Sequence, residues 1–156
     1  MSGARQRVLR VGLTGGIACG RTTVARVLVR LGARVVDADA IAHRLLAPGG
    51  EAVSQVAAAF GRGCLDSAGG VDRRALATLV FSDRGALARL EAILHPLILA
   101  ESERLLGDFA RVKRSGIAVL DAALLVETGA HGRYDRLVVV ACDPDLQVGR
   151  LMARNG

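Results

Sequence analysis

In the first part of the chain, short apolar runs flank one amphipathic segment, and together they predict a strand, a helix and a second strand. Residues 8–13 form an apolar run that ends in a glycine-rich turn, which is typical of a buried strand. Between Val24 and Leu31, valine and leucine recur at the spacing of one helical face, and Gly32 ends that helix. Residues 33–37 are again short and apolar. This order is a βαβ unit, so we expect a parallel sheet.

The middle of the chain, from residue 39 to about residue 114, follows helical spacing instead. One-sided apolar patterns at 53–60, 76–80 and 87–94 predict helices, and a polar turn at 66–70 separates the first two. A further helix is expected to begin at His95-Pro96, because proline is favoured in the first turn of a helix. Strand patterns return at 117–120 and 137–141, and Asp143 is then expected to cap a helix that starts at Pro144.

These elements predict an α/β fold, with a parallel-sheet core that an inserted helical region interrupts. The length of 156 residues is that of a single domain. We assign the core to about residues 7–38 and 115–156, and the inserted region to about residues 39–114. Apolar residues make up 51% and charged residues 23%, proportions that are ordinary for globular proteins and exclude a disordered chain.

Two further features of the composition bear on where the protein works. No window reaches the roughly 18 apolar residues of a membrane span, and the N-terminus lacks the apolar stretch of a signal peptide. Three cysteines, Cys19, Cys64 and Cys142, are odd in number and far apart, which argues against a disulfide framework or a zinc site. We therefore expect a cytoplasmic protein without a membrane partner.

The net charge of +6 favours an anionic partner, and every basic residue except Lys113 is an arginine. Aromatic residues are only 3% of the chain and the arginines are scattered, which argues against a nucleic-acid partner. A small polyphosphate is therefore the anion that the composition favours. The sequence leaves the oligomeric state open.

A glycine-rich loop between the first predicted strand and helix carries the strongest chemical signal. Residues 15–22 read GGIACGRT and fit the phosphate-loop pattern G-x-x-x-x-G-K-[ST], except that Arg21 stands at the lysine position. Glycines let successive backbone N–H groups face one anion, and the helix adds its positive end. We expect ATP to bind at Gly15, Gly16, Ala18, Cys19, Gly20, Arg21, Thr22 and Thr23. The alternative is a glycine-rich turn that binds no ligand.

Several short blocks along the chain resemble the dephospho-coenzyme A kinase family. They are VGLTGGI at 11–17 followed by Gly20, VVDAD at 35–39, IAH at 41–43, PG at 48–49, DRRAL at 72–76, LHPLI at 94–98, LLVE at 124–127 and RLMAR at 150–154. They run in order from about residue 8 to the last residue, and the DAD and HPLI blocks are specific to that family rather than general to phosphate-loop proteins.

The resemblance implies a fold like that of nucleoside-monophosphate kinases, with the inserted helical region serving the CoA substrate. It implies transfer of the γ-phosphoryl group of ATP to the 3′-hydroxyl of dephospho-CoA, the last step of coenzyme A synthesis. Dephospho-CoA is therefore the expected small-molecule substrate.

Two carboxylates follow predicted strands, at the edge where open parallel sheets gather their ligands. Asp39 can accept the proton of the attacking hydroxyl, as the resemblance also implies, and the alternative is a helix cap. Asp121 and the Thr22 hydroxyl are the expected Mg²⁺ ligands, and a strand-end turn is the alternative for Asp121. Asp37 is expected to be buried and structural.

The remaining candidates are basic side chains. His43 and Arg44 follow Asp39 by about one helical turn and are expected to contact substrate phosphates, or else to be solvated surface. His95 is a substrate-binding candidate with a structural hydrogen bond as its alternative. Arg150 and Arg154 lie on one helical face, and in the family this stretch leads into a lid where arginine stabilises the transferring phosphate.

The sequence departs from the family pattern at three places. Arg21 replaces a lysine, Ala18 and Ala123 stand where the family usually has glycine and proline, and the sequence ends at Gly156, so that we expect the C-terminal lid and last strand to be truncated. Two functions therefore remain open: an ATP-dependent dephospho-CoA kinase, or a degenerate phosphate-loop module that binds nucleotide or CoA without efficient transfer.

Overall fold

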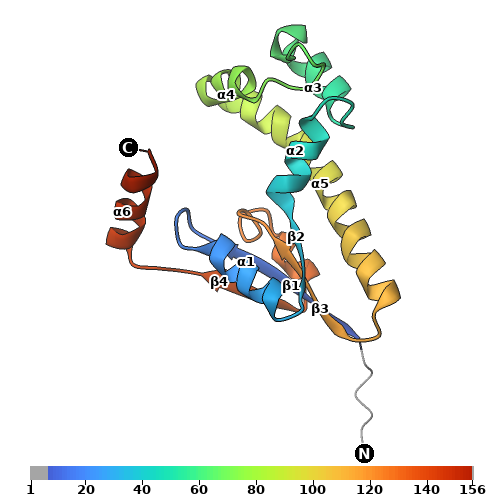
Figure 1. Ribbon diagram of the computed structural model, residues 1–156. Coiled ribbons are helices and arrows are strands. Elements are labelled where there is room, and N and C mark those ends of the chain that lie inside the picture. Colours follow the sequence, from blue (N-terminus) through green and yellow to red (C-terminus); the bar gives the residue numbers. More distant parts are fainter. Residues whose placement is uncertain (1–6, 156) are drawn as a thin grey trace, which may run out of the picture. The chain divides into compact units, whose positions relative to one another are not determined.

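The computed structural model describes residues 7–155 and has at its centre a four-stranded, wholly parallel sheet (Figure 1). Its strands are β1 (Val8–Gly15), β2 (Arg34–Asp37), β3 (Gly116–Asp121) and β4 (Arg136–Val140), in the order β2-β3-β1-β4. The predicted α/β class and parallel sheet are thus confirmed. Because all four strands run the same way, their carboxyl ends meet at one edge of the sheet.

The register of the sheet determines which residues meet at that edge. Leu13 of β1 and Asp37 of β2 both pair with Asp121 of β3, while Gly15 pairs with Val140 of β4. The end of β1 therefore lies between a strand that ends in an aspartate and a strand that leads towards Cys142. Asp37 itself is exposed, so the expectation that it is buried was wrong, because β2 is an edge strand and ends there.

Helix α1 (Arg21–Arg30) covers one face of the sheet. Its buried Ala25 packs with Val11, Leu13 and Val119, and half-buried apolar residues of α1 and the strands surround this cluster. Gly32 ends the helix with a φ of 90°, a conformation that residues other than glycine adopt only with strain. This is the helix and stop signal that the amphipathic spacing predicts.

The segment between β3 and β4 is held to β1 through a carboxylate. Asp135 accepts a 2.8 Å hydrogen bond from the backbone N–H of Arg10, and its own N–H donates to the Arg10 carbonyl at 2.8 Å. Burial works against the charged form, but the Arg10 N–H and the charge of Arg7 outweigh it and lower the pKa of Asp135 below its usual value. The short 3₁₀ helix Ala130–Arg133 lies in this segment.

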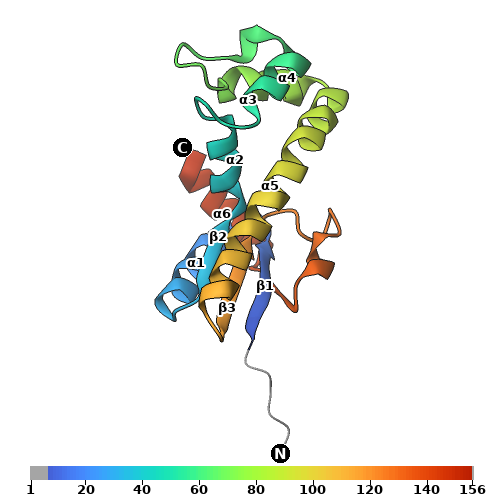
Figure 2. The ribbon, with the colours of Figure 1, turned by 90° about the vertical axis from the view of Figure 1, so that its right-hand side faces the viewer.

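The chain divides into two compact units, one comprising residues up to Asp37 and from Arg104 on, the other Ala38–Glu103. The second unit holds α2 (Ala38–Leu46), α3 (Val53–Phe60), the 3₁₀ turn Arg62–Cys64, α4 (Arg73–Ser82) and the first part of α5 (Arg84–Val112), as Figure 2 shows. Ile41, Val56, Cys64 and Leu76 form part of its core. Asp72 caps α4 by accepting hydrogen bonds from the N–H groups of Arg74 and Ala75. That residues 1–156 form a single domain stays a prediction.

One expected helix boundary was wrong. Pro96 lies inside α5, and the helix that was expected to begin at His95-Pro96 instead continues from Arg84 through Val112. Proline removes one backbone hydrogen bond from a helix interior, but Pro96 is exposed, and α5 continues on both sides of it. The last helix is as expected: α6 (Pro144–Asn155) begins at Pro144, with the Asp143 carboxylate accepting from the N–H of Asp145 at 2.8 Å.

Within the described residues, no helix combines the length and the apolar character that crossing a membrane requires.

Candidate functional site

The glycine-rich loop lies between the end of β1 and the start of α1, as the motif requires. Gly20 precedes α1 in the left-handed conformation, with a φ of 94°, and its carbonyl accepts the N–H groups of Thr23 and Val24. The loop borders a cavity of about 770 Å³, lined by residues 15–24 and Arg150. A cavity lined by backbone N–H groups and arginine at a helix N-terminus is suited to a phosphorylated ligand.

Backbone geometry constrains two positions in this loop, of which one is filled by the favoured glycine and the other is not. A Cβ on Gly15 would lie 2.4 Å from the carbonyl oxygen of Val140, so only glycine allows β4 to approach so closely. Ala18 has a φ of 58°, in the left-handed region that favours glycine. The loop therefore carries local strain at the position where the sequence departs from the family's usual glycine.

The two charged residues that the sequence singled out at this edge lie against each other. The Nε of Arg21 is 2.5 Å from Oδ1 of Asp121, and both side chains are largely buried, at 18% and 8% exposure. Arg21 is the first residue of α1, and Asp121 is the last residue of β3. The expected phosphate-binding cation and the expected Mg²⁺ ligand thus form an ion pair, which no motif had indicated.

Helix α6 contributes a second group of polar contacts to the loop. Nη1 of Arg150 donates to the carbonyl of Ala18 at 3.2 Å, which supports the placement of this arginine beside the loop. Nε2 of Gln147 donates to the Cys19 thiol at 2.6 Å, and Nη1 of Arg150 also lies 4.0 Å from the thiol of Cys142. Arg154 belongs to α6, but its side chain lies outside the described residues.

The thiols of Cys19 and Cys142 differ in pKa because their surroundings differ. Burial alone would raise the pKa of Cys19, but hydrogen bonds from Gln147, Cys142 and the backbone of Gly16 together lower it below the usual thiol value. Burial raises the pKa of Cys142, and its hydrogen bond with Cys19 adds to that increase. Cys19 is therefore the thiol of the pair that more readily becomes a thiolate.

The oxygen donors expected for Mg²⁺ suit that ion in kind. Thr22 is exposed on the first turn of α1, and Asp121 ends the neighbouring strand. Among the described residues, no three His, Cys, Asp or Glu side chains cluster as a metal cage would need. This is compatible with Mg²⁺, because at nucleotide sites it usually takes one or two protein oxygens and completes its shell with phosphates and water.

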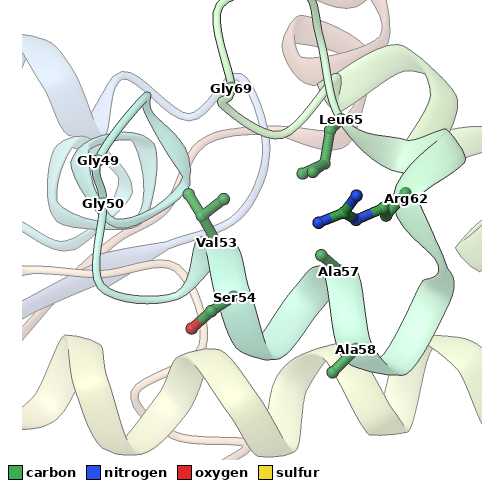
Figure 3. Close-up of a pocket in the computed structure, with 9 residues that line it drawn as sticks. All are labelled: Gly49, Gly50, Val53, Ser54, Ala57, Ala58, Arg62, Leu65 and Gly69. Atoms are coloured by element: carbon green, nitrogen blue, oxygen red, sulfur yellow. The ribbon is translucent and has the colours of Figure 1, made fainter.

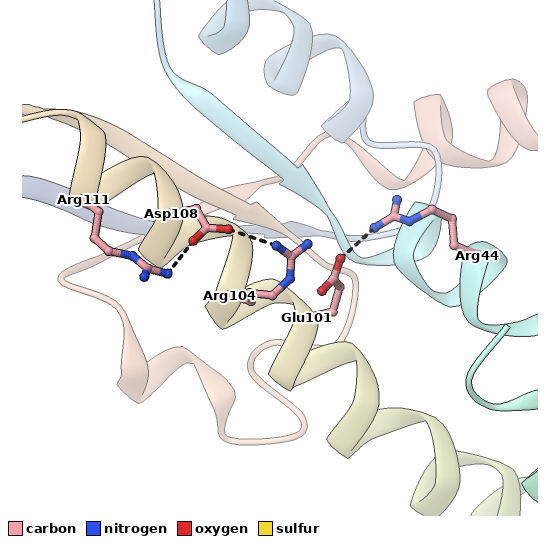
Figure 4. A network of polar contacts seen from close by, with 5 residues as sticks. All are labelled: Arg44, Glu101, Arg104, Asp108 and Arg111. Carbon is pink, nitrogen blue, oxygen red and sulfur yellow. Dashed lines mark hydrogen bonds and ion pairs between the residues drawn. The ribbon is translucent and has the colours of Figure 1, made fainter.

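The other candidates belong to the second unit, so their role at the phosphate loop stays a prediction. Asp39 is exposed in the first turn of α2, two residues beyond the end of β2. His43 is exposed on the same helix, and Arg44 forms a 3.6 Å ion pair with Glu101 of α5 (Figure 4). His95 is exposed beside Pro96.

A second cavity, of about 560 Å³, lies within the helical unit (Figure 3). Its lining consists of small and apolar residues with one arginine: Gly49, Gly50, Val53, Ser54, Ala57, Ala58, Arg62, Leu65 and Gly69. None of the predicted substrate contacts lines it. This cavity therefore does not test the assignment of the inserted region to the CoA substrate, which stays a prediction from the family resemblance.

Sequence reasoning missed Gln147 and Cys142, which complete the surroundings of Cys19. One signal could have indicated Cys142: it follows the predicted strand at 137–141, and the ends of parallel strands share one edge of the sheet. No local pattern distinguishes Gln147, whose role depends on how α6 returns to the loop.

The parallel sheet, the loop before α1 and the ion-paired aspartate at the end of β3 define a phosphate-loop protein of the kinase type. The family model for dephospho-CoA kinase matches residues 9–156. The dephospho-CoA kinase of Geobacter sulfurreducens is 49% identical over 148 residues, covering 94% of this chain and 74% of that protein. The dephospho-CoA kinase of Aromatoleum aromaticum is 48% identical over 146 residues, covering 93% of this chain and 69% of that protein.

Two solved structures extend the comparison to the fold. A crystal structure of a Thermus thermophilus protein superposes with a TM-score of 0.75 at 35% identity, covering 97% of this chain and 74% of that one. A dephospho-CoA kinase from Campylobacter jejuni has the same fold, with a TM-score of 0.60 at 17% identity and coverage of 94% and 95%.

This chain belongs to the dephospho-CoA kinase family. The resemblance found in the sequence is thereby confirmed. The activity of the family is ATP-dependent transfer of a phosphoryl group to dephospho-CoA, the last step of coenzyme A biosynthesis.

Proposed function

We propose that this chain is an active dephospho-CoA kinase that holds ATP at the loop of residues 15–23 and transfers its γ-phosphoryl group to the 3′-hydroxyl of dephospho-CoA. The observation that carries the proposal is the cavity along that loop, which the start of α1 and the guanidinium of Arg150 both border. Membership of the family supplies the reaction and the acceptor.

The loop residues would bind the triphosphate through backbone N–H groups and the positive end of α1. Arg21 and Arg150 would add charge where negative charge develops on the transferring group, and Arg154 is proposed for the same task. Arg21 is paired with Asp121, so phosphate would compete with that carboxylate for the guanidinium. An arginine is well suited to bridge both, because its planar fork presents five N–H donors.

Mg²⁺ would be held by the Thr22 hydroxyl and by Asp121, the latter directly or through water. When bound, the ion neutralises charge on the phosphates and holds them in position for transfer. The protein's own part is to present two oxygens of suitable chemistry beside the loop. On metal binding, Asp121 would exchange its ion pair with Arg21 for the metal.

Asp39 is proposed to accept the proton of the attacking 3′-hydroxyl and to orient that oxygen towards the γ-phosphate. It is exposed, and it lies just beyond the carboxyl end of β2, the side of a parallel sheet on which ligands collect. His43, Arg44 and His95 are proposed contacts to the substrate's phosphates. Of these, Arg44 would have to exchange its ion pair with Glu101 for the ligand.

We also propose a cytoplasmic location and a small-molecule partner rather than nucleic acid. All three cysteines are free thiols, and the reducing cytosol is the compartment that keeps thiols in this state. The scattered arginines and the low aromatic content favour a compact polyphosphate over an extended nucleic-acid chain.

A second function is favoured by one observation, the Arg21–Asp121 ion pair. If the pair persists when nucleotide binds, the loop lacks its phosphate cation and the chain would be a binding module without efficient transfer. ADP formation with and without dephospho-CoA separates the two functions. A kinase should release ADP only when dephospho-CoA is present and not with AMP, adenosine or cytidine, whereas a binding module should release little with any acceptor.

Asp39→Asn tests the proposed role of the carboxylate. Turnover should fall by roughly 10²-fold or more while ATP binding is unchanged, because the amide cannot accept the proton. The structure places Asp39 inside the first turn of α2, as its second residue, so the expected alternative of a helix cap was wrong. A residue that only supports that turn would tolerate the change to an amide with little loss of turnover. Asp72→Asn, at the observed cap of α4, is the matched control and should retain full turnover. Normal turnover of Asp39→Asn would eliminate the proton-acceptor role.

A further inference from the structure

Two cysteines that come from distant parts of the chain meet at the phosphate loop. Cys19 lies in the loop one residue before Gly20, and Cys142 follows β4 by two residues. Nη1 of Arg150 lies 3.2 Å from the carbonyl oxygen of Ala18 and 4.0 Å from the Cys142 sulfur, which places Cys142 beside the loop residue that precedes Cys19. The two thiols are close enough to influence each other's pKa. All of these groups belong to the same compact unit.

Two side chains of α6 donate towards the sulfur atoms of this pair. Nε2 of Gln147 lies 2.6 Å from the Cys19 sulfur, and Nη1 of Arg150 lies 4.0 Å from the Cys142 sulfur. Cys19 is only 7% exposed, yet it lines the loop cavity, which a small molecule can enter. Cys142 is half-buried. These surroundings stabilise a thiolate on Cys19 with a second thiol within its reach.

We propose that Cys19 and Cys142 are an oxidative modification site, at which a hydroperoxide converts the two neighbouring thiols into a disulfide that disables the phosphate loop. The existence of the disulfide does not depend on the proposed function, whereas its effect on ATP does.

The chemistry requires two steps and one equivalent of peroxide. The Cys19 thiolate attacks one peroxide oxygen, the O–O bond breaks, and hydroxide leaves as water after taking a proton, which gives a sulfenic acid on Cys19. The Cys142 sulfur then attacks the Cys19 sulfur, the S–O bond breaks, and a second water leaves. Two thiols have lost two electrons in total, and hydrogen peroxide has been reduced to two waters.

The disulfide would change the loop because its geometry is stricter than that of a hydrogen bond. The two sulfur atoms must approach to about 2.05 Å, with a dihedral angle near 90°. The strand end is held by the close contact between Gly15 and Val140, so the movement falls mainly on the loop around Cys19. Cys19 adjoins Gly20, the residue before α1, so N–H groups aimed at the phosphates move with it.

The first experiment maps the bond and measures ATP binding on the same sample. The full-length reduced chain is treated with hydrogen peroxide, alkylated and digested, and the peptides are identified by mass spectrometry. We expect a Cys19–Cys142 linked peptide. We also expect the affinity for a fluorescent ATP analogue to fall by roughly tenfold or more, and dithiothreitol to restore it. Absence of the linked peptide, or unchanged binding when the link has formed, would overturn the proposal.

Two serine variants separate the disulfide from other damage. With diamide, an oxidant that joins thiols without making sulfenic acids, Cys142→Ser should keep its affinity for the ATP analogue, because no partner for Cys19 remains. Cys64→Ser is the matched control: Cys64 is fully buried elsewhere and donates to the Gly61 carbonyl, so this variant should lose affinity as the parent does. Equal loss in Cys142→Ser and the parent would overturn the proposal.

A third variant tests the thiolate without removing either cysteine. Gln147→Leu deletes the donor to the Cys19 sulfur, and Cys19 should then react with peroxide more slowly at neutral pH while Cys142 stays in place. If the rate at which Cys19 reacts with peroxide were unchanged, the proposal that the Gln147 donor activates the Cys19 thiol would be overturned. Because peptide mapping needs no catalysis, a chain that forms the disulfide but makes no ADP would refute the proposed function and leave this inference standing.

Discussion

Removal of the Asp121 carboxylate by Asp121→Ala should lower the free energy of unfolding far more than removal of an exposed carboxylate does. The pair with Arg21 has 2.5 Å between Nε and Oδ1 and side-chain exposures of only 18% and 8%. Unit charges about 4 Å apart attract by about 4 kcal/mol at an effective dielectric constant of 20, and desolvation offsets much of that. Breaking such a pair leaves the largely buried Arg21 without the Asp121 carboxylate, so we expect a loss of about 3 kcal/mol of unfolding free energy.

The same chemistry on the surface provides the control. Asp108 of α5 accepts ion pairs from Arg104 and Arg111, but its side chain is 45% exposed and its partners are more exposed still (Figure 4). Exposed helix pairs of this spacing contribute about 0.3–0.5 kcal/mol each, so Asp108→Ala should cost less than about 1 kcal/mol. Urea unfolding followed by circular dichroism measures the loss of unfolding free energy in Asp121→Ala and in Asp108→Ala. Equal losses for the two variants would refute the argument from burial.

The pair also predicts how ATP binding depends on magnesium. Asp121→Asn removes the ion pair between Asp121 and Arg21 and also removes a charged, proposed Mg²⁺ ligand. With EDTA present, the variant should therefore bind ATP more tightly than the parent, by roughly tenfold. Addition of Mg²⁺ should tighten binding less in the variant than in the parent. If Asp121→Asn weakens ATP binding equally with and without Mg²⁺, then Asp121 only maintains the fold at the end of β3.

Three more outcomes follow from the loop and its support. Ala18→Gly should relieve the φ of 58° and raise the unfolding free energy by up to about 1 kcal/mol, measured in urea. Gly15→Ala should cost about 2–3 kcal/mol in the same assay and impair ATP binding, because its Cβ would lie 2.4 Å from the Val140 carbonyl. Asp135→Asn should lower the urea midpoint at pH 7. Because the folded-state pKa of Asp135 is lowered, the difference in midpoint between parent and variant should persist at pH values above the ordinary pKa of 3.8 and be lost as the pH falls below it. A difference in midpoint that is independent of pH would contradict the claim that the charge of Asp135 stabilises the fold.

Local sequence was sufficient to predict the elements and the loop. The strand before Gly15, the helix that Gly32 ends and the cap at Asp143 depend on residues close together in the chain, and their spacing is fixed by covalent geometry. The phosphate-loop motif is local for the same reason, since one turn and one helix N-terminus make the anion site. Pro96 shows the limit of local patterns, because proline is favoured at a helix start, yet α5 continues through it from Arg84 to Val112.

What the tertiary structure decided is which strand ends meet. The sequence predicted both Arg21 and Asp121 as functional but not their pairing, which requires the order β2-β3-β1-β4 and the register of Leu13 with Asp121. The contact between Cys19 and Cys142 likewise depends on β4 lying beside β1 and on α6 turning back to the loop. Each strand pattern is compatible with several neighbours and registers, because period-two alternation fixes only which face is buried, and the packing of the whole sheet selects among them.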